Sequence, residues 1–194
     1  MSPCQAQISK VDTGAGASGT GGAAPGVDSG QAGFWAPSMG PLANAGAQNM
    51  VANQARGLRV VCPKTMTITK IGFAVAAVAS VDDPVDVGIY DASLNRLGSS
   101  GSTLGKLTSL GRQQINLVAP VVVTQGVVYY AVFGYGAAGG TVAQVMCASE
   151  YSGGLNLLFP AGMEGLFWNA TFPLPATLGA SGNLNAPPIL ALMQ

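Results

Sequence analysis

The sequence predicts an all-β protein, a β-sandwich or jelly roll of about eight antiparallel strands with an extended N-terminal arm. Short apolar runs, many of them alternating with polar residues, recur from residue 57 onward. Turn-forming residues separate these runs at intervals of roughly 8–15 residues, as in domains built only from strands. No window has the apolar spacing that marks an amphipathic helix, so helices are not expected.

A change of composition near residue 48 divides the 194-residue chain into two parts. Residues 13–33 are mostly Gly, Ala, Ser and Thr, which bury too little apolar surface to offset the entropy lost on ordering. Two large aromatic residues, Phe34 and Trp35, follow this segment. We therefore predict an arm over residues 1–48, anchored on another subunit by Phe34 and Trp35. Residues 49–194 are predicted to form the β-sandwich domain, with long C-terminal loops.

The first strands of the domain are predicted from their apolar patterns. Residues 58–62 form a short apolar run that Pro63 closes. Residues 65–69 alternate with a period of two, as a half-buried strand does. The apolar phase then slips, and Gly72 beside the slip indicates a β-bulge. After the slip, the apolar side chains that share one face are Ile71, Phe73 and Val75.

Further strands follow along the chain at residues 85–89, 96–97, 113–118, 121–123, 127–133, 141–148 and 189–193. The run over residues 127–133 is apolar on both faces, which predicts a central place in a sheet. Residues 149–187 are rich in Gly, Pro and Asn, so we predict long loops there. The aromatic residues expected to pin these loops are Phe159, Phe167, Trp168 and Phe172.

Several short stretches carry a resemblance to a known family: TITKIG at residues 67–72, VGIYD at 87–91, QINL at 114–117 and VYYA at 128–131. Together with LPA at 174–176 and APPILAL at 186–192, they resemble a β-sandwich module that recurs in virion proteins of tailed bacteriophages. In that family the module occurs in tail-fibre, adhesin and head-decoration proteins. The resemblance implies a structural protein of the virion, assembled in the host cytoplasm, whose partners are the major capsid protein or tail proteins.

The small share of charged residues in the chain favours a protein that works as part of an assembly. Charged residues make up 8% of the sequence, against roughly 25% in ordinary soluble domains. A surface with so few charges is better explained if neighbouring subunits cover much of it, which predicts a homo-oligomer or a particle-bound protein. The formal net charge is zero and no basic run occurs, so nucleic acid is not an expected partner. No apolar stretch is long enough to span a bilayer, and no export signal is recognised at the start.

The residue types that most enzymes and metal sites use are scarce. The sequence has no histidine, which excludes Ser-His-Asp and Cys-His catalysis and leaves no plausible zinc site. Its three cysteines, Cys4, Cys62 and Cys147, are far apart and are predicted to be reduced thiols. Cys62 and Cys147 are expected to be buried in strands. We expect no enzymatic activity, no metal and no cofactor.

Three local patterns have a chemical interpretation beside a plain structural one. Residues 14–19 match the GxGxxG string, but no strand precedes them and no helix follows, as a dinucleotide site requires. Glu150 and Glu164 are the only glutamates, and nothing in the sequence indicates that they face one another across a glycosidase cleft. Four nearby aspartates are predicted to form a solvated turn, with a calcium site as the alternative: Asp82, Asp83, Asp86 and Asp91.

Two loop aromatics, Tyr151 and Trp168, join Phe34 and Trp35 as candidate partner-binding residues. Such rings bury against another subunit or stack on a sugar ring. The first hypothesis is a capsid decoration or cement protein that stabilises the head through its N-terminal arm. The alternative is a tail fibre or receptor-binding module that recognises glycan on the host surface.

Overall fold

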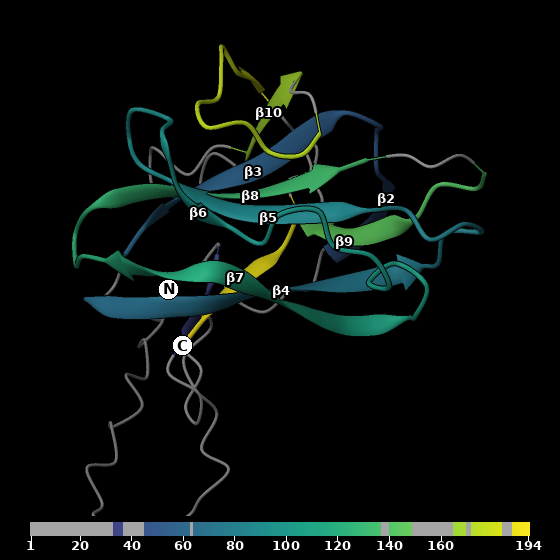
Figure 1. Ribbon diagram of the computed structural model, residues 1–194, viewed down its shortest axis with the longest axis horizontal. Coiled ribbons are helices and arrows are strands. Elements are labelled where there is room, and N and C mark those ends of the chain that lie inside the picture. The colour runs from purple at the N-terminus through teal and green to yellow at the C-terminus, as the bar shows by residue number, and fades with distance from the viewer. Residues whose placement is uncertain are drawn as a thin grey trace, which may run out of the picture.

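Two antiparallel sheets, each of six strands, lie one above the other in the described part of the chain (Figure 1). The computed structural model describes residues 33–36, 45–62, 64–136, 140–148, 165–169, 172–183 and 188–194. None of these residues is helical, which confirms the all-β prediction. Accordingly, the described residues contain no helix with the length and apolarity needed to cross a membrane.

The lower sheet in Figure 1, here called the β4 sheet, is organised around its longest-paired strand, β4. β7 pairs with one edge of β4 over nearly its whole length, so β12 and β9 share the other edge, one after the other. β1 pairs with the outer side of β12, and β2 with the outer side of β9. The strands of this sheet are β1 (Gly33–Ala36), β2 (Ala45–Asn49), β4 (Met66–Ala77), β7 (Gly111–Val123), β9 (Gln144–Ala148) and β12 (Leu190–Met193).

The second sheet, here called the β8 sheet, has the order β11-β10-β3-β8-β5-β6. β8 lies between β3 and β5 and is apolar on both faces, which confirms the central position predicted for this run. The strands are β3 (Gln54–Val61), β5 (Val85–Tyr90), β6 (Arg96–Ser99), β8 (Val128–Tyr135), β10 (Gly165–Asn169) and β11 (Gly182–Asn183).

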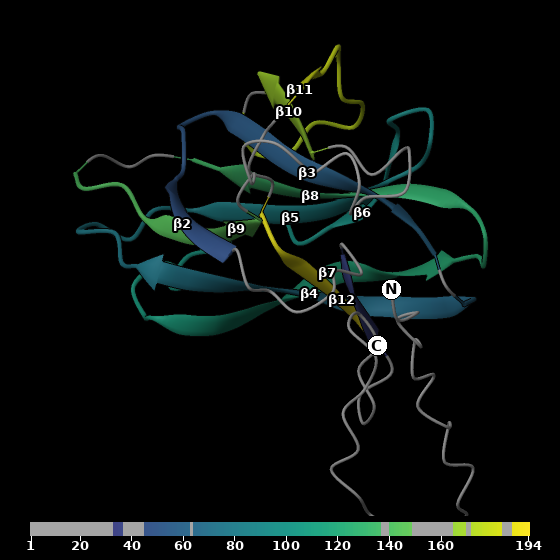
Figure 2. The ribbon, with the colours of Figure 1, turned by 180° about the vertical axis from the view of Figure 1, so that it is seen from behind.

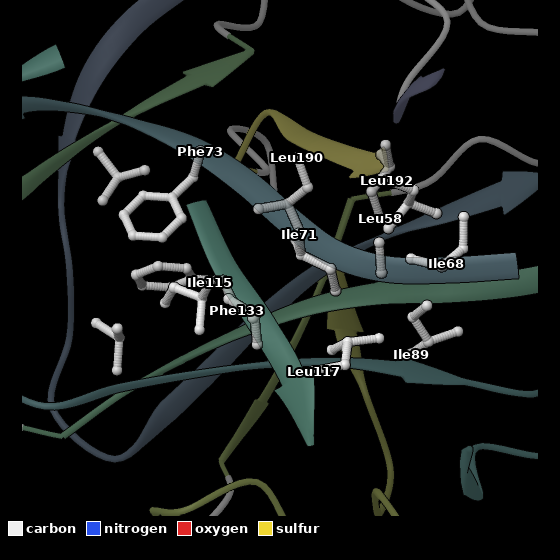
Figure 3. Close-up of a cluster of buried hydrophobic side chains, with 14 of the residues drawn as sticks. Leu58, Ile68, Ile71, Phe73, Ile89, Ile115, Leu117, Phe133, Leu190 and Leu192 are labelled. Carbon is white, nitrogen blue, oxygen red and sulfur yellow. The ribbon is translucent and has the colours of Figure 1, made fainter. Parts of the chain in front are cut away.

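Side chains from both sheets meet in one apolar core between them (Figure 3). Phe73 of β4 and Phe133 of β8 meet edge to face, with ring centroids 5.0 Å apart. Burying one such side chain contributes about 1.5–3 kcal/mol, so this shared core holds the sheets together. The labelled core residues in Figure 3 are Leu58, Ile68, Ile71, Phe73, Ile89, Ile115, Leu117, Phe133, Leu190 and Leu192.

An irregularity in the pairing of β4 is present close to the predicted place, but it lies opposite Thr69 and its extra residues belong to β7, so the prediction of a bulge in β4 itself at Gly72 is corrected. Ile68 is opposite Val121 and Lys70 is opposite Asn116, so residues 117–120 of β7 face a single residue of β4. The predicted common face beyond the bulge, with Ile71, Phe73 and Val75, is confirmed, because all three side chains are buried. The two strands predicted at 113–118 and 121–123 are one continuous strand, β7, because the bulge absorbs the irregular stretch between them.

A second apolar cluster covers the outer face of the β8 sheet. Leu166 and Trp168 of β10 pack there together with Leu174 and Leu178 of the following segment. Figure 2 shows β10 and β11 beyond β3 at the top of the molecule. The prediction of long loops over residues 149–187 is therefore wrong for residues 165–169 and 182–183, which are strands. The Gly- and Asn-rich composition concealed them, because packing on the sheet rather than local propensity supports these short strands.

The sheet begins inside the segment predicted to be an arm. β1 and most of β2 fall within residues 1–48, and both are paired strands of the β4 sheet. β2 has the sequence AGAQN, in which small and polar residues conceal the strand.

The two sheets approach each other closely along one side, where β6 lies near β7. A Cβ atom added at Gly98 of β6 would come within 2.5 Å of Cγ2 of Val121 in β7. Glycine is therefore required for this approach, which joins the sheets along that side.

Candidate interaction surface

The structure places the predicted anchor, Phe34 and Trp35, in β1 at the outer border of the β4 sheet. Phe34 is opposite Leu192 and Trp35 is opposite Ala191, both in the C-terminal strand β12. The anchor segment is therefore tied by backbone pairing to this subunit's own sheet. Its role on another subunit stays a prediction. Tyr151, Glu150, Glu164 and residues 14–19 lie outside the described residues.

Trp168 lies in β10 rather than in a loop, so that part of its prediction is corrected. Its side chain is 1% exposed and meets Tyr130 edge to face, with ring centroids 6.1 Å apart. Its indole Nε1 is buried and has no hydrogen-bond partner among the described residues. In this structure the Trp168 side chain packs inside the subunit, in the apolar cluster that covers the β8 sheet.

The aspartate cluster is not a uniformly solvated turn, because two of its members are buried. Asp83 accepts a hydrogen bond from the Tyr135 hydroxyl, and burial together with this bond raises the pKa of Tyr135. Asp82 Oδ1 accepts a bond of 2.7 Å from the Gly105 amide. Asp91 Oδ1 accepts bonds from the amides of Ser93 and Asn95, as in an Asx turn. Within the described ranges no three His, Cys, Asp or Glu side chains gather to hold a metal ion, so the calcium alternative gains no support there.

Asp86 is the most enclosed of these acids, and it ties three segments together. Its Oδ2 accepts a bond of 3.0 Å from the Leu174 amide, and its Oδ1 accepts one of 3.1 Å from Ser100 Oγ. Burial raises the pKa of Asp86, while these bonds and the charge of Arg96 act in the opposite direction. The Arg96 guanidinium itself donates to the Leu174 carbonyl. Asp86 therefore holds together β5, the end of β6 and the segment around Leu174.

Two neighbouring loops present large apolar side chains to solvent at one end of the domain. One loop connects β4 to β5 (residues 78–84) and the other connects β6 to β7 (residues 100–110), where β4 ends and β7 begins (Figure 1). The Ala79 amide donates to the Leu107 carbonyl at 3.0 Å, which together with the Asp82–Gly105 bond holds the loops together. We call the exposed apolar residues of these loops the loop-end patch: Val78, Val81, Leu104 and Leu110.

Sequence reasoning missed the loop-end patch, although a signal was present. Leu104, Leu107 and Leu110 are the only large apolar residues in a Gly- and Ser-rich stretch over residues 98–111. Leu107 is fully buried and anchors the loop, whereas Leu104 and Leu110 are 58% and 66% exposed. Isolated leucines in a polar loop indicate either a buried anchor or an exposed apolar surface, and this loop has a buried Leu107 beside exposed Leu104 and Leu110.

One crevice of the described surface is small for a ligand site. A crevice with an empty volume of about 150 Å³ lies between β3, β8 and the segment at Phe172. This volume is below the range of about 300–1,000 Å³ that is usual for ligand pockets. The crevice holds no carboxylate, lysine or cysteine, since its lining residues are Asn53, Gln54, Ala55, Gly134, Tyr135, Phe172 and Leu174.

Cys62 and Cys147 are both buried, as predicted, and both are free. Cys147 lies in a strand, β9, as expected, whereas Cys62 directly follows β3. Burial raises the pKa of Cys147 to about 12. Cys62 donates a bond of 3.1 Å from its Sγ to the Lys64 carbonyl. Both thiols therefore stay protonated near neutral pH and are poor nucleophiles. Cys4 lies outside the described residues.

The sequence matches no protein-family model and no curated protein.

Proposed function

We propose that this chain is a non-enzymatic structural protein of a tailed-phage virion, a decoration or cement protein that stabilises the head. In this proposal the domain is a β-sandwich of the jelly-roll kind. Two six-stranded antiparallel sheets that share one core support that interpretation. The protein would assemble on the particle in the host cytoplasm, with the major capsid protein and further copies of itself as partners.

The observation that carries this proposal is the loop-end patch. Four large aliphatic side chains are exposed on two loops that hydrogen bonds hold side by side. Large apolar side chains exposed on neighbouring loops are typical of surfaces that bind other proteins.

The position of β1 adds a second argument. Residues 1–32 precede a strand at the outer border of the β4 sheet, so this part of the chain starts from the edge of the domain. Thirty-two extended residues reach on the order of 100 Å, which is ample for contact with neighbouring subunits. An arm adds backbone hydrogen bonds at the sheet edge of a partner, and many copies on one shell act together.

The alternative, a tail fibre or receptor-binding module, requires a surface suited to glycan. Sugar recognition uses exposed aromatic rings, but among the described candidates Tyr90, Tyr129, Tyr135 and Trp168 are buried and Tyr130 is half-buried. The described loop-end patch is aliphatic, which favours a protein partner over a glycan.

Binding of variants to particles that lack the protein tests the proposal. We expect Leu104→Ser with Leu110→Ser to reduce attachment at least tenfold, measured by co-sedimentation with such particles. Leu97→Ser is the matched control, because Leu97 is 45% exposed but lies on β6 rather than on these loops. Equal attachment of the double variant and the control would contradict the assignment of the loop-end patch.

A further inference from the structure

The outer border of the β4 sheet has an open backbone edge at β2. β12 and β9 run antiparallel to β4, and β1 and β2 run antiparallel to them in turn. β1 and β2 therefore follow the direction of β4 and border the sheet one after the other. No described residue pairs with the side of β2 that faces away from β9.

The hydrogen bonds show which groups β2 presents at this edge. The Met50 amide donates to the Ala143 carbonyl at 3.2 Å, so the backbone N–H of Met50 points toward the strand that contains β9. Because the direction of the backbone N–H and C=O groups alternates along a strand, those of Gln48 and Gly46 also point toward β9. The N–H and C=O groups of Ala45, Ala47 and Asn49 therefore point outward, away from β9.

This edge lacks the features by which proteins usually prevent strand addition. Charged side chains and prolines at edges block such pairing. No charged residue occurs between Asp28 and Arg56, and β2 itself contains no proline. The borders at β6, β7 and β11 are better protected: β6 and β7 lie against each other, β7 carries Pro120, and β11 has only two residues.

We propose that β2 pairs with β2 of a second copy of this chain, antiparallel and with a two-fold axis at Ala47. In that register Ala47 exchanges backbone bonds with its own counterpart, and Ala45 does so with Asn49. On a two-fold axis any charged side chain meets its own copy, and like charges repel. The neutral sequence AGAQN avoids this repulsion, so it suits self-pairing.

Substitution at Ala47 can block pairing at the outer edge of β2 while the fold of the subunit stays intact. Proline at this position removes an outward N–H and leaves the bonds from β2 to β9 intact. We expect the full-length protein to sediment as a concentration-dependent dimer at micromolar concentrations. Ala47→Pro should raise the dissociation constant at least tenfold, with an unchanged Tm. Ala180→Pro is the matched control, because Ala180 is exposed and lies in no strand.

Two further variants keep the test decisive if the proline disturbs β2. Ala47→Lys places like charges at the axis, so it should weaken the dimer at low salt and less so at high salt. Ala47→Cys in a Cys4→Ser background should give a covalent dimer on mild oxidation, because directly opposed residues of a hydrogen-bonded pair are within disulfide reach. Ala180→Cys should give none.

The proposal is overturned if the wild-type protein stays monomeric at about 100 μM. It is also overturned by a dimer that all three Ala47 variants leave unchanged and that Ala47→Cys does not cross-link. These outcomes leave the capsid assignment untouched, since attachment to particles is measured separately.

Discussion

Phe73 and Phe133 come from different sheets and meet edge to face at the centre of the core, 5.0 Å between ring centroids. Neither residue is near the other in sequence, and each is at most 1% exposed. The pair is therefore a direct measure of how much the contact between the sheets contributes to stability.

Removing one of these rings should destabilise the whole domain. We expect Phe73→Ala to lower the free energy of unfolding by about 3–5 kcal/mol, because it leaves a cavity between the sheets. Urea denaturation followed by tryptophan fluorescence measures the change. Thr67→Ala, at an exposed position in the same strand, should change it by less than about 0.5 kcal/mol. A similar loss from both substitutions would contradict the shared core.

The bond from Tyr135 to Asp83 should matter because the carboxylate is buried. Tyr135→Phe removes the hydroxyl donor and leaves Asp83 with one partner fewer. We expect a loss of about 1–3 kcal/mol in the free energy of unfolding, as for other buried polar groups that lose a partner. Tyr130→Phe is the control, since the Tyr130 ring is only half-buried. Equal stability of Tyr135→Phe and wild type would show that this bond contributes nothing.

The raised pKa of Asp86 predicts a pH dependence of stability with a definite sign. The folded protein holds the proton of Asp86 more tightly than the unfolded chain, whose aspartates titrate near 3.8. The contribution of Asp86 to stability is therefore fully present below pH 3.8 and is lost as the pH rises through the raised folded-state pKa.

Asp86→Asn isolates this contribution, because the amide stays neutral. Its oxygen can accept from the Leu174 amide and its NH2 group can donate to Ser100 Oγ. We expect the variant to gain stability relative to wild type as the pH rises from 3.8 toward 7, measured by thermal denaturation at each pH. A difference that is constant with pH would exclude a raised pKa at Asp86.

Gly98 tests the close approach of β6 to β7. Gly98→Ala places a methyl group against Val121 and should cost about 1–3 kcal/mol through overpacking. Gly179→Ala is the matched control, because a Cβ atom there meets nothing within 4 Å. If both substitutions have the same small effect on the urea midpoint, the two strands do not meet as described.

The regular parts of the fold could be predicted from the sequence because the pattern of apolar and polar residues along each strand follows which of its faces are buried. Ile71, Phe73 and Val75 alternate with small or polar residues, and β8 is apolar on both faces, so their burial and placement were predicted correctly. The phase slip beside Gly72 correctly indicated irregular pairing in this part of β4, but the extra residues are in β7, opposite Thr69.

The parts that were missed depend on contacts distant in sequence. β2 has no apolar pattern, and its position follows from pairing with β9, almost a hundred residues later. Asp83 and Asp86 look like solvent-exposed turn residues until Tyr135 and Leu174 are brought onto them. Trp168 looked like a surface aromatic because the strand that carries it is too short to recognise.

Heat inactivation of particles with and without this protein tests most directly its proposed role in stabilising a virus head. Contacts that exist only on the assembled shell raise the stability of that state by mass action. We therefore predict that particles lacking the protein adsorb to host cells at the normal rate but lose infectivity at lower temperature. Lost adsorption with unchanged heat resistance would contradict the capsid assignment and favour the receptor-binding alternative.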